Sequence, residues 1–191
     1  MNSNNIQYDV FLEGKCVDLI LLTEEIVEKS NWFRWFNDPE TTKYMQKGYF
    51  PNTKDDQLKF FKKEIDGIKT KIQVGILHKA DGVLIGIISL ENIDFLNRKC
   101  EIAGLIGEAK YKKIKYWLEA NRIIMSHAVS ALNIRKVHGG SLAKELSVFY
   151  ERMLGFKSEG LLREHIYKSG EFRDVYLFGK IFEPTIRLGD L

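Results

Sequence analysis

The stretch CEIAGLIGEAKYKKIKYWLEANRIIMSHAVSAL, residues 100–132, decides the fold of this chain. Residues 100–106 are typical of a short β-strand, and residues 107–116 form a basic connection. Residues 117–132 predict a long helix, because apolar side chains recur close to one face of it, at Trp117, Ala120, Ile124, Ala128 and Ala131. A strand that leads through a loop into a long helix is typical of a domain that mixes both kinds of element.

Outward from this stretch, strand and helix patterns follow each other along the whole chain. The hydrophobic pattern predicts strands at residues 15–22, 72–77, 83–90, 136–141, 157–163 and 175–181. It predicts further helices over residues 23–36, 53–68 and 144–154. Thr53-x-x-Asp56 has the spacing of a capping box, with Asp in place of Glu or Gln. The sequence therefore predicts a mixed α/β (α+β) fold, with residues 1–191 in a single domain.

The composition is that of a globular protein with one core. The chain has 191 residues, of which 45% are hydrophobic and 12% aromatic, and its formal net charge is only +3. A chain of this length can bury roughly 70% of its unfolded surface, which is enough for a single domain. Its apolar runs are far shorter than the ~18 residues of a membrane helix, and the start MNSNNIQYDV lacks the pattern of a signal peptide. We therefore expect a cytoplasmic protein without a membrane partner.

Several kinds of site are excluded by missing motifs. The sequence has no Walker-type phosphate loop, no G-x-S-x-G and no H-E-x-x-H. Its four histidines are scattered, and Cys16 and Cys100 have neither metal-ligand nor disulfide-framework spacing. We therefore expect no metal. Because no aromatic platform or nucleic-acid motif accompanies the basic residues, we also expect no nucleic-acid partner.

The loop before the long helix concentrates positive charge. Its four lysines, Lys110, Lys112, Lys113 and Lys115, exceed the formal net charge of +3. A loop from a strand into a helix exposes backbone N–H groups at the positive end of the helix dipole, where a phosphate can bind. The alternative is a solvated basic surface, and the residues alone leave both interpretations open.

Two side chains are candidates for proton transfer. Tyr150, on the predicted helix 144–154, could protonate a leaving thiolate, and the alternative is a tyrosine in the core or at the rim of an amphipathic helix. Glu101, on the predicted strand 100–106, could accept a proton from an incoming ammonium. The alternative is that Glu101 merely lies on the solvent face of a half-buried strand.

In their order, these pieces resemble the GNAT superfamily of acetyl-CoA-dependent N-acetyltransferases, in the branch related to the ribosomal-protein alanine acetyltransferases. The resemblance covers about residues 11–182. Its strongest block is Gly155-Phe-Lys-x-Glu-Gly-x-Leu-Arg-Glu-His165, and Glu101-Ile-Ala-Gly-Leu-Ile-Gly107 is similar to the strand that pairs with the pantetheine arm. The resemblance implies a twisted mixed sheet flanked by helices and splayed between its fourth and fifth strands, where residues 100–106 part from 136–141.

The resemblance also implies a reaction, the transfer of acetyl from acetyl-CoA to a primary amine. Glu101 would be the base and Tyr150 the acid, and backbone N–H groups near residues 105–106 would polarise the thioester. The cofactor-binding residues that it implies are Leu105, Ile106, Gly107, Lys112, Lys113, Lys115, Tyr116 and Trp117. Residues 35–53 are similar to members that acetylate nucleotide-linked amino sugars, which implies such a small-molecule acceptor. The acceptor-binding residues would be Trp35, Asn37, Tyr44 and Phe50.

The sequence departs from the family pattern in two places. The pyrophosphate loop of the family reads Gln/Arg-x-x-Gly-x-Gly/Ala, and its defined positions hold Lys112, Lys115 and Trp117 here. Both glycines, which let a backbone approach a pyrophosphate closely, are therefore absent. The family tyrosine lies four residues before the glycine of Gly-Phe. That position is Glu151, about 100° around the helix from Tyr150.

These departures and the resemblance leave alternatives open. The acceptor could instead be a protein N-terminus, a polyamine or an antibiotic amine. A GNAT-fold protein that has lost acetyl-CoA binding is the non-enzymatic alternative, and core packing is the alternative role of Trp35. Dimers are common in this branch, so a homodimer is among the expected assemblies.

Overall fold

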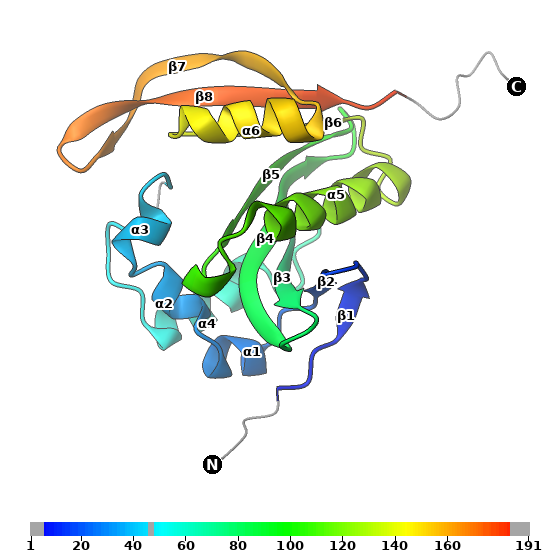
Figure 1. Ribbon diagram of the computed structural model, residues 1–191, viewed down its shortest axis with the longest axis vertical. Coiled ribbons are helices and arrows are strands. Elements are labelled where there is room, and N and C mark those ends of the chain that lie inside the picture. Colours follow the sequence, from blue (N-terminus) through cyan, green and yellow to red (C-terminus); the bar gives the residue numbers. More distant parts are fainter. Residues whose placement is uncertain (1–5, 46–47, 184–191) are drawn as a thin grey trace, which may run out of the picture.

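The computed structural model describes residues 6–45 and 48–183, and their strands form one eight-stranded sheet in the order β1-β2-β3-β4-β5-β6-β8-β7 (Figure 1). The strands are β1 (Val10–Leu12), β2 (Val17–Ile20), β3 (Ile72–His78), β4 (Val83–Asp94), β5 (Lys99–Ile106), β6 (Lys136–Ser141), β7 (Lys157–Lys168) and β8 (Glu171–Ile181). Neighbouring strands are antiparallel, except that β5 and β6 are parallel. The predicted mixed sheet is confirmed.

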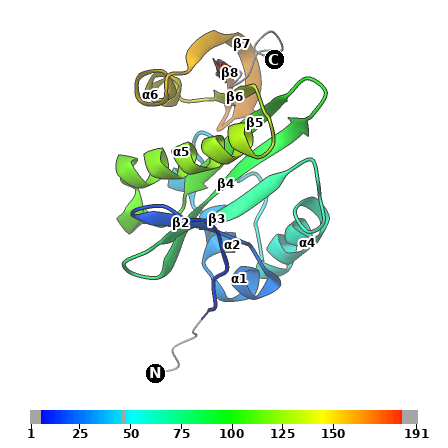
Figure 2. The same ribbon diagram turned by 90° about the vertical axis from the view of Figure 1, so that its right-hand side faces the viewer.

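Helices cover both faces of this sheet. They are α1 (Glu24–Lys29), α2 (Trp32–Trp35), α3 (Pro39–Thr42), α4 (Lys54–Glu64), α5 (Ile114–Ser130) and α6 (Lys144–Leu154). The apolar side chains of α5 and α6 pack into one core, and those of α1, α2 and α4 pack into a second core on the other face (Figure 2). None of the helices in the described residues is long and apolar enough to cross a membrane.

The helices before β3 follow local sequence signals. The predicted helix over residues 23–36 is broken at Ser30, whose extended backbone ends α1. The short helix α2 then brings Trp32 and Trp35 into the second core. At the start of α4, Thr53 and Asp56 form the predicted capping box, with each side chain accepting the other's backbone N–H at 3.1 Å. Aspartate is therefore long enough to complete this cap.

The long helix α5 begins earlier than the apolar pattern predicts, at Ile114. A 3₁₀ turn, Ala109–Tyr111, shortens the connection from β5. Lys115 and Tyr116 consequently lie within the helix instead of in the connection before it. The sequence analysis also missed β1 and the outer half of the β7–β8 hairpin, because exposed residues dominate β1 and β7 and leave little apolar alternation to detect.

The parallel contact between β5 and β6 is short. Only residues 99–101 of β5 pair with residues 136–138 of β6. Beyond these pairs β5 stays beside β4 as far as Ile106, whereas β6 follows β8 (Figure 1). The two strands therefore part, which confirms the predicted splay. They are the fifth and sixth strands instead of the fourth and fifth, because β1 is additional.

Candidate active site

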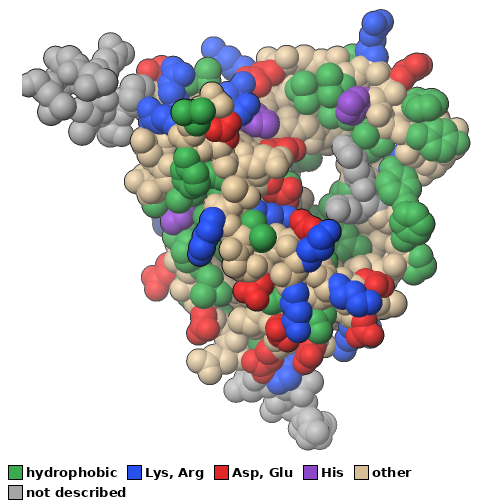
Figure 3. All heavy atoms as spheres, turned by 180° about the vertical axis from the view of Figure 1, so that it is seen from behind, with side chains coloured by type: hydrophobic (Ala, Val, Ile, Leu, Met, Phe, Trp, Pro, Cys, Tyr) green, Lys and Arg blue, Asp and Glu red, His purple; other side chains and the backbone are tan. Residues whose placement is uncertain are grey.

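The parting of β5 from β6 creates a slot in the middle of the sheet. Seen from behind, the molecule has an opening between the part that carries β6–β8 and the part that carries α1–α4, and acidic side chains lie at one side of it (Figure 3). We call the end of the slot at residues 99–101 and 136–138 its closed end. The other end lies beside the start of α5, which directly follows β5 and the 3₁₀ turn.

The edge of β5 offers unpaired backbone groups to this slot. The amide of Gly107 donates to the carbonyl of Ile85 on β4 at 2.9 Å. Because an antiparallel ladder alternates, Leu105 also directs its backbone groups toward β4, and the N–H and C=O groups of Gly104 and Ile106 point away from β4 toward β6. The prediction for Ile106 agrees with this register. The predicted role of a Leu105 N–H does not agree with it, because this N–H points toward β4. The Leu105 side chain is buried in the second core.

A glutamate and a histidine face each other at the closed end. Glu101 of β5 and His138 of β6 are direct partners in the parallel register, so their side chains project from the same face of the sheet. Asn92 Nδ2 donates to Glu101 Oε2 at 3.3 Å from a left-handed backbone conformation (φ 51°) in the irregular part of β4. Burial lowers the pKa of His138, against an opposing effect of the Glu101 charge. The imidazole is therefore neutral at neutral pH.

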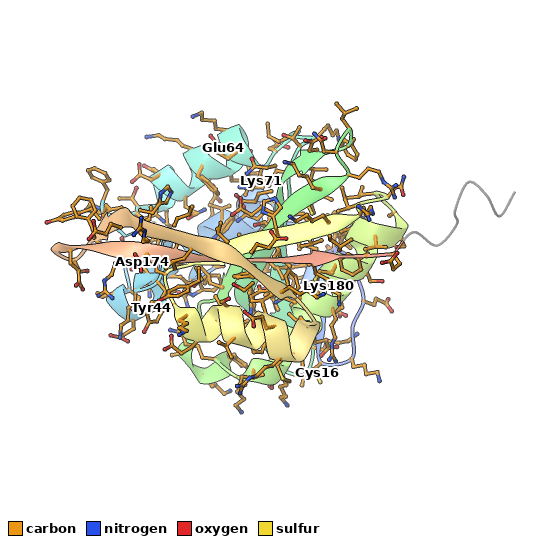
Figure 4. All side chains as sticks on the ribbon, turned by 90° about the horizontal axis from the view of Figure 1, so that it is seen from above. Cys16, Tyr44, Glu64, Lys71, Asp174 and Lys180 are labelled. Carbon is orange, nitrogen blue, oxygen red and sulfur yellow. The ribbon has the colours of Figure 1, made fainter. Side chains whose placement is uncertain are left out.

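A second carboxylate lies next to Glu101. Glu91 is its partner across the β4–β5 ladder, and Glu91 Oε1 accepts from Ser89 Oγ at 3.0 Å. Lys71 Nζ lies 3.2 Å from the same carboxylate oxygen, and Figure 4 shows Lys71 between α4 and the sheet. The charge of Glu91 is thus compensated within the protein, whereas the hydrogen-bond partner of Glu101 among the described residues is the neutral Asn92 amide.

A side-chain network fixes the connection between β5 and α5. Tyr111 donates its hydroxyl to Asp81 Oδ2 at 2.5 Å, and this hydrogen bond holds the pKa of Asp81 below its ordinary value. Lys110 Nζ and His78 Nδ1 lie 3.6 and 3.3 Å from the same oxygen. The hydroxyl of Tyr116 meets His78 Nε2 at 3.0 Å. The buried ring of Tyr116 is thus part of this network, and its hydroxyl is engaged by His78. Its predicted cofactor contact stays a prediction.

The remaining lysines of the connection differ in their partners. Lys112 Nζ donates to Thr41 Oγ1 at 3.1 Å and lies 4.0 Å from Asp38 Oδ2, which ties it to α3. Lys113 and Lys115 flank the start of α5 and form no ion pair with any residue that the structure describes. The first turn of α5 has no acidic residue, and no side chain caps it. Two of the predicted lysines therefore remain available to an anion.

Trp117, at a family glycine position, lies in the first turn of α5. A Cβ built on Gly104 would lie 3.0 Å from the Trp117 ring, so the indole rests on β5. The half-buried indole packs against the first core. The side chain at this family glycine position is therefore directed toward the sheet.

Tyr150 is enclosed in the first core. Its side chain is 2% exposed, its hydroxyl donates to Asn121 Oδ1 at 2.9 Å, and its ring stacks on Phe178 at 4.4 Å. Burial raises the pKa of this phenol well above its ordinary value. The placement does not suit the predicted role of acid, because the hydroxyl has no exposed path to the slot. Glu151, at the family tyrosine position, is half-buried and accepts from Ser147 Oγ at 3.3 Å.

Two of the four predicted acceptor-binding residues have structural roles instead. Trp35 is 4% exposed, and its indole N–H donates to Glu108 Oε1 at 3.1 Å. Its ring lies against Gly107, where an added Cβ would come within 2.0 Å of it. Asn37 uses its amide to clamp Asn52, donating to the Asn52 carbonyl and accepting from the Asn52 N–H at 2.7 Å each. Trp35 is therefore enclosed, whereas Asn37 is exposed and has its amide engaged by Asn52.

The other two predicted acceptor residues, Tyr44 and Phe50, are exposed by 47% and 85%. They flank a segment that contacts the tip of the β7–β8 hairpin. Tyr49 Oη donates to the carbonyl of Tyr167 at 3.0 Å. Figure 4 shows Tyr44 at the same end of the molecule as Asp174 of β8. The tip of the hairpin is thus joined to the segment before α4.

The sequence profile of the acetyltransferase (GNAT) domain matches residues 19–146. The chain belongs to the GNAT acetyltransferase family. A Bacillus subtilis (strain 168) protein named ribosomal N-acetyltransferase YdaF is 31% identical over 108 residues, which are 56% of this chain and 57% of that protein. The chain thus matches little more than half the length of this curated relative.

Solved structures show the same GNAT fold. Spermidine N-acetyltransferase from Vibrio cholerae, in complex with CoA and spermine, has a TM-score of 0.76 at 18% identity, with 88% of this chain and 96% of that chain covered. RimL, a ribosomal L7/L12 alpha-N-protein acetyltransferase, has a TM-score of 0.75 at 14% identity, with 95% of this chain and 99% of that chain covered. At these identities the likeness is one of fold.

The residues of this GNAT domain fit acetyl-CoA. The slot-facing backbone of Gly104 and Ile106 can pair with the amide groups of a pantetheine arm. The open start of α5, with Lys113 and Lys115 beside it, suits a pyrophosphate. No group of three or more potential metal ligands occurs among residues 6–45 and 48–183.

The sequence analysis missed three residues of this site, Asn92, Gly104 and His138. For His138 the bounds of the predicted strands were not precise enough. If strands 100–106 and 136–141 are aligned in parallel from their first residues, Glu101 is paired with Val137, whereas the observed register pairs it with His138. Asn92 could not be found in this way, because its position depends on the irregularity in β4.

The enclosed position of Tyr150 leads to a test. Tyr150→Phe should keep most of the turnover, because the hydroxyl bonds only within the core. It should lower the free energy of unfolding by about 1 kcal/mol, since Asn121 loses a buried hydrogen-bond partner. Turnover and denaturant unfolding measure the two effects. A large fall in turnover at unchanged stability would restore Tyr150 as the acid.

Proposed function

We propose that this chain transfers the acetyl group of acetyl-CoA to a primary amine. The observation that carries the proposal is the combination of three features along one slot. These are the unpaired backbone edge of β5, the uncapped basic start of α5, and the carboxylate of Glu101 at the closed end. Membership of the GNAT family supports the same reaction.

Each part of the slot has its own task in this reaction. When bound, acetyl-CoA supplies an activated acetyl thioester. Lys113, Lys115 and the first amides of α5 hold its phosphates, and the N–H of Ile106 is placed to donate to a carbonyl in the slot. Glu101 attracts the ammonium of the acceptor. Most of the acceleration then comes from holding amine and thioester together.

The acceptor that suits this slot best is a small, slender, positively charged amine. The carboxylate of Glu101, which accepts from the neutral Asn92 amide, favours a cation. We expect the contact between Tyr49 and Tyr167 at the tip of the hairpin to favour a slender acceptor. The amino-sugar acceptor rested on residues 35–53, in which Trp35 and Asn37 now have structural roles. It therefore remains as a competitor in the test.

The test separates cofactor binding from acceptor choice. Calorimetric titration with acetyl-CoA should give saturable heat, and its absence at millimolar acetyl-CoA would contradict the transferase function and favour a non-catalytic GNAT protein. Release of the CoA thiol should then be compared for spermidine, an alanine-terminated peptide and a UDP-linked amino sugar. We expect the highest kcat/KM with spermidine. A higher value for the sugar or the peptide would overturn the acceptor class and keep the reaction.

A further inference from the structure

His138 stands apart from the other charged or titratable groups at the closed end of the slot, and the inference drawn from it rests on the proposed transferase function. Lys136, two residues before it, is paired with Glu159 at 2.8 Å. Glu91 is paired with Lys71, and Glu101 is held by Asn92. Among described residues, none forms a hydrogen bond or ion pair with the imidazole of His138.

The imidazole of His138 is placed where it can accept a proton from the acceptor ammonium. His138 belongs to the last residue pair before β5 and β6 diverge, and it lies on the same face as Glu101. It is half-buried. Because Glu101 and His138 are direct partners in the register, an amine attracted by Glu101 comes close to the ring.

We propose that His138 is the general base of the reaction and that Glu101 stabilises the imidazolium that forms. One proton of the acceptor ammonium passes to a ring nitrogen of His138. The free amine then attacks the thioester carbonyl carbon, the C–S bond breaks, and the second proton leaves the nitrogen with the thiolate as a CoA thiol. The imidazolium finally releases its proton to water. This sequence needs no acid from Tyr150.

The charges around His138 define the pH at which it works. Glu101 and Lys99 face it from β5, Lys136 from β6 and Glu159 from β7, and the charges of the two glutamates oppose those of the two lysines. Burial outweighs these charges and lowers the pKa of His138. The neutral, proton-accepting form is thus present at neutral pH, and activity should be lost as the pH falls through this lowered pKa.

The experiment compares pH profiles of kcat with saturating acetyl-CoA and the best amine of the panel. His138→Gln should lower kcat at pH 7.5 by about 100-fold or more, and His138→Asn should do the same. Both variants should also lose the acidic limb, which is the fall of kcat at low pH. Glu101→Gln should keep the limb but move it to lower pH, because the imidazolium loses its stabilising charge. His127→Gln is the matched control. His127 also has a pKa lowered by burial, but it lies on α5 against Phe11.

Histidine ring NMR gives a readout that needs no turnover. The His138 signal, assigned by its loss in His138→Gln or His138→Asn, should titrate at lower pH in Glu101→Gln than in the unmodified protein. The inference is overturned if an active protein keeps its acidic limb in both His138 variants, or if Glu101→Gln leaves the His138 titration unchanged. If the unmodified chain binds acetyl-CoA but acetylates no amine, the proposed function fails and the inference fails with it.

Discussion

Alanine at both Lys113 and Lys115 should raise the KM for acetyl-CoA by on the order of tenfold to hundredfold. These two lysines flank a helix start that has no acidic residue and no side-chain cap. Their charges therefore act directly on an anion bound there. The kcat should change little, because neither side chain belongs to the closed end where the amine reacts. Initial rates at varied acetyl-CoA measure both constants.

The matched control for this pair is Lys112→Ala. Lys112 is equally part of the basic connection, but Thr41 and Asp38 already engage its ammonium. Its removal should change the KM for acetyl-CoA less than twofold. Raising the salt concentration should weaken binding to the unmodified protein more than to the double variant, since the electrostatic contribution is screened. An equal effect of Lys112→Ala would mean that the whole loop acts as a diffuse basic surface.

The second large effect concerns stability. Trp35→Ala should lower the free energy of unfolding by about 3–5 kcal/mol, because it empties a large buried site in the second core. For a chain of this size that corresponds to a fall of roughly 6–20 °C in Tm. The loss should also loosen the end of β5, since the indole packs on Gly107 and bonds Glu108. Denaturant unfolding and calorimetry measure these changes.

Two controls separate packing from acceptor binding. Trp35→Phe keeps a ring against Gly107 but loses the hydrogen bond to Glu108, so its effect should be clearly smaller. Phe50→Ala removes a side chain that is 85% exposed and should leave Tm within about 1 °C. If Trp35→Ala instead kept Tm and raised only the KM of the amine, the predicted acceptor role of Trp35 would be restored.

The sequence predicted the layout well where one periodicity dominates. The strand 136–141 and the helix 144–154 with Gly155 as its left-handed end have the predicted bounds. The splay was implied by the family resemblance and is present between β5 and β6. Elements at the edge of the sheet were missed, because β1 has only three residues and the outer part of β7 is mostly exposed.

The candidate site was harder to predict, since residue type does not reveal which polar groups are already engaged. Trp35 looked like an aromatic that could face an acceptor, yet a single contact with Glu108 accounts for its polar atom. Tyr150 looked like an acid, yet its hydroxyl is bonded to Asn121, 29 positions away in sequence. The four lysines form one charge cluster in the sequence. Only their tertiary contacts distinguish Lys110 and Lys112, which have side-chain partners, from Lys113 and Lys115.

The short parallel contact between β5 and β6 has a consequence for how this protein can diverge. The half-sheet β1–β5, with α5, holds the backbone edge and helix start suited to the cofactor, and the half-sheet β6–β8 carries the hairpin that contacts Tyr49. Strand pairing and backbone hydrogen bonds join these halves over the short stretches 98–101 and 135–138. We therefore expect substitutions in the hairpin to disturb the backbone edge of β5 little, so that the two halves of one continuous sheet can vary separately.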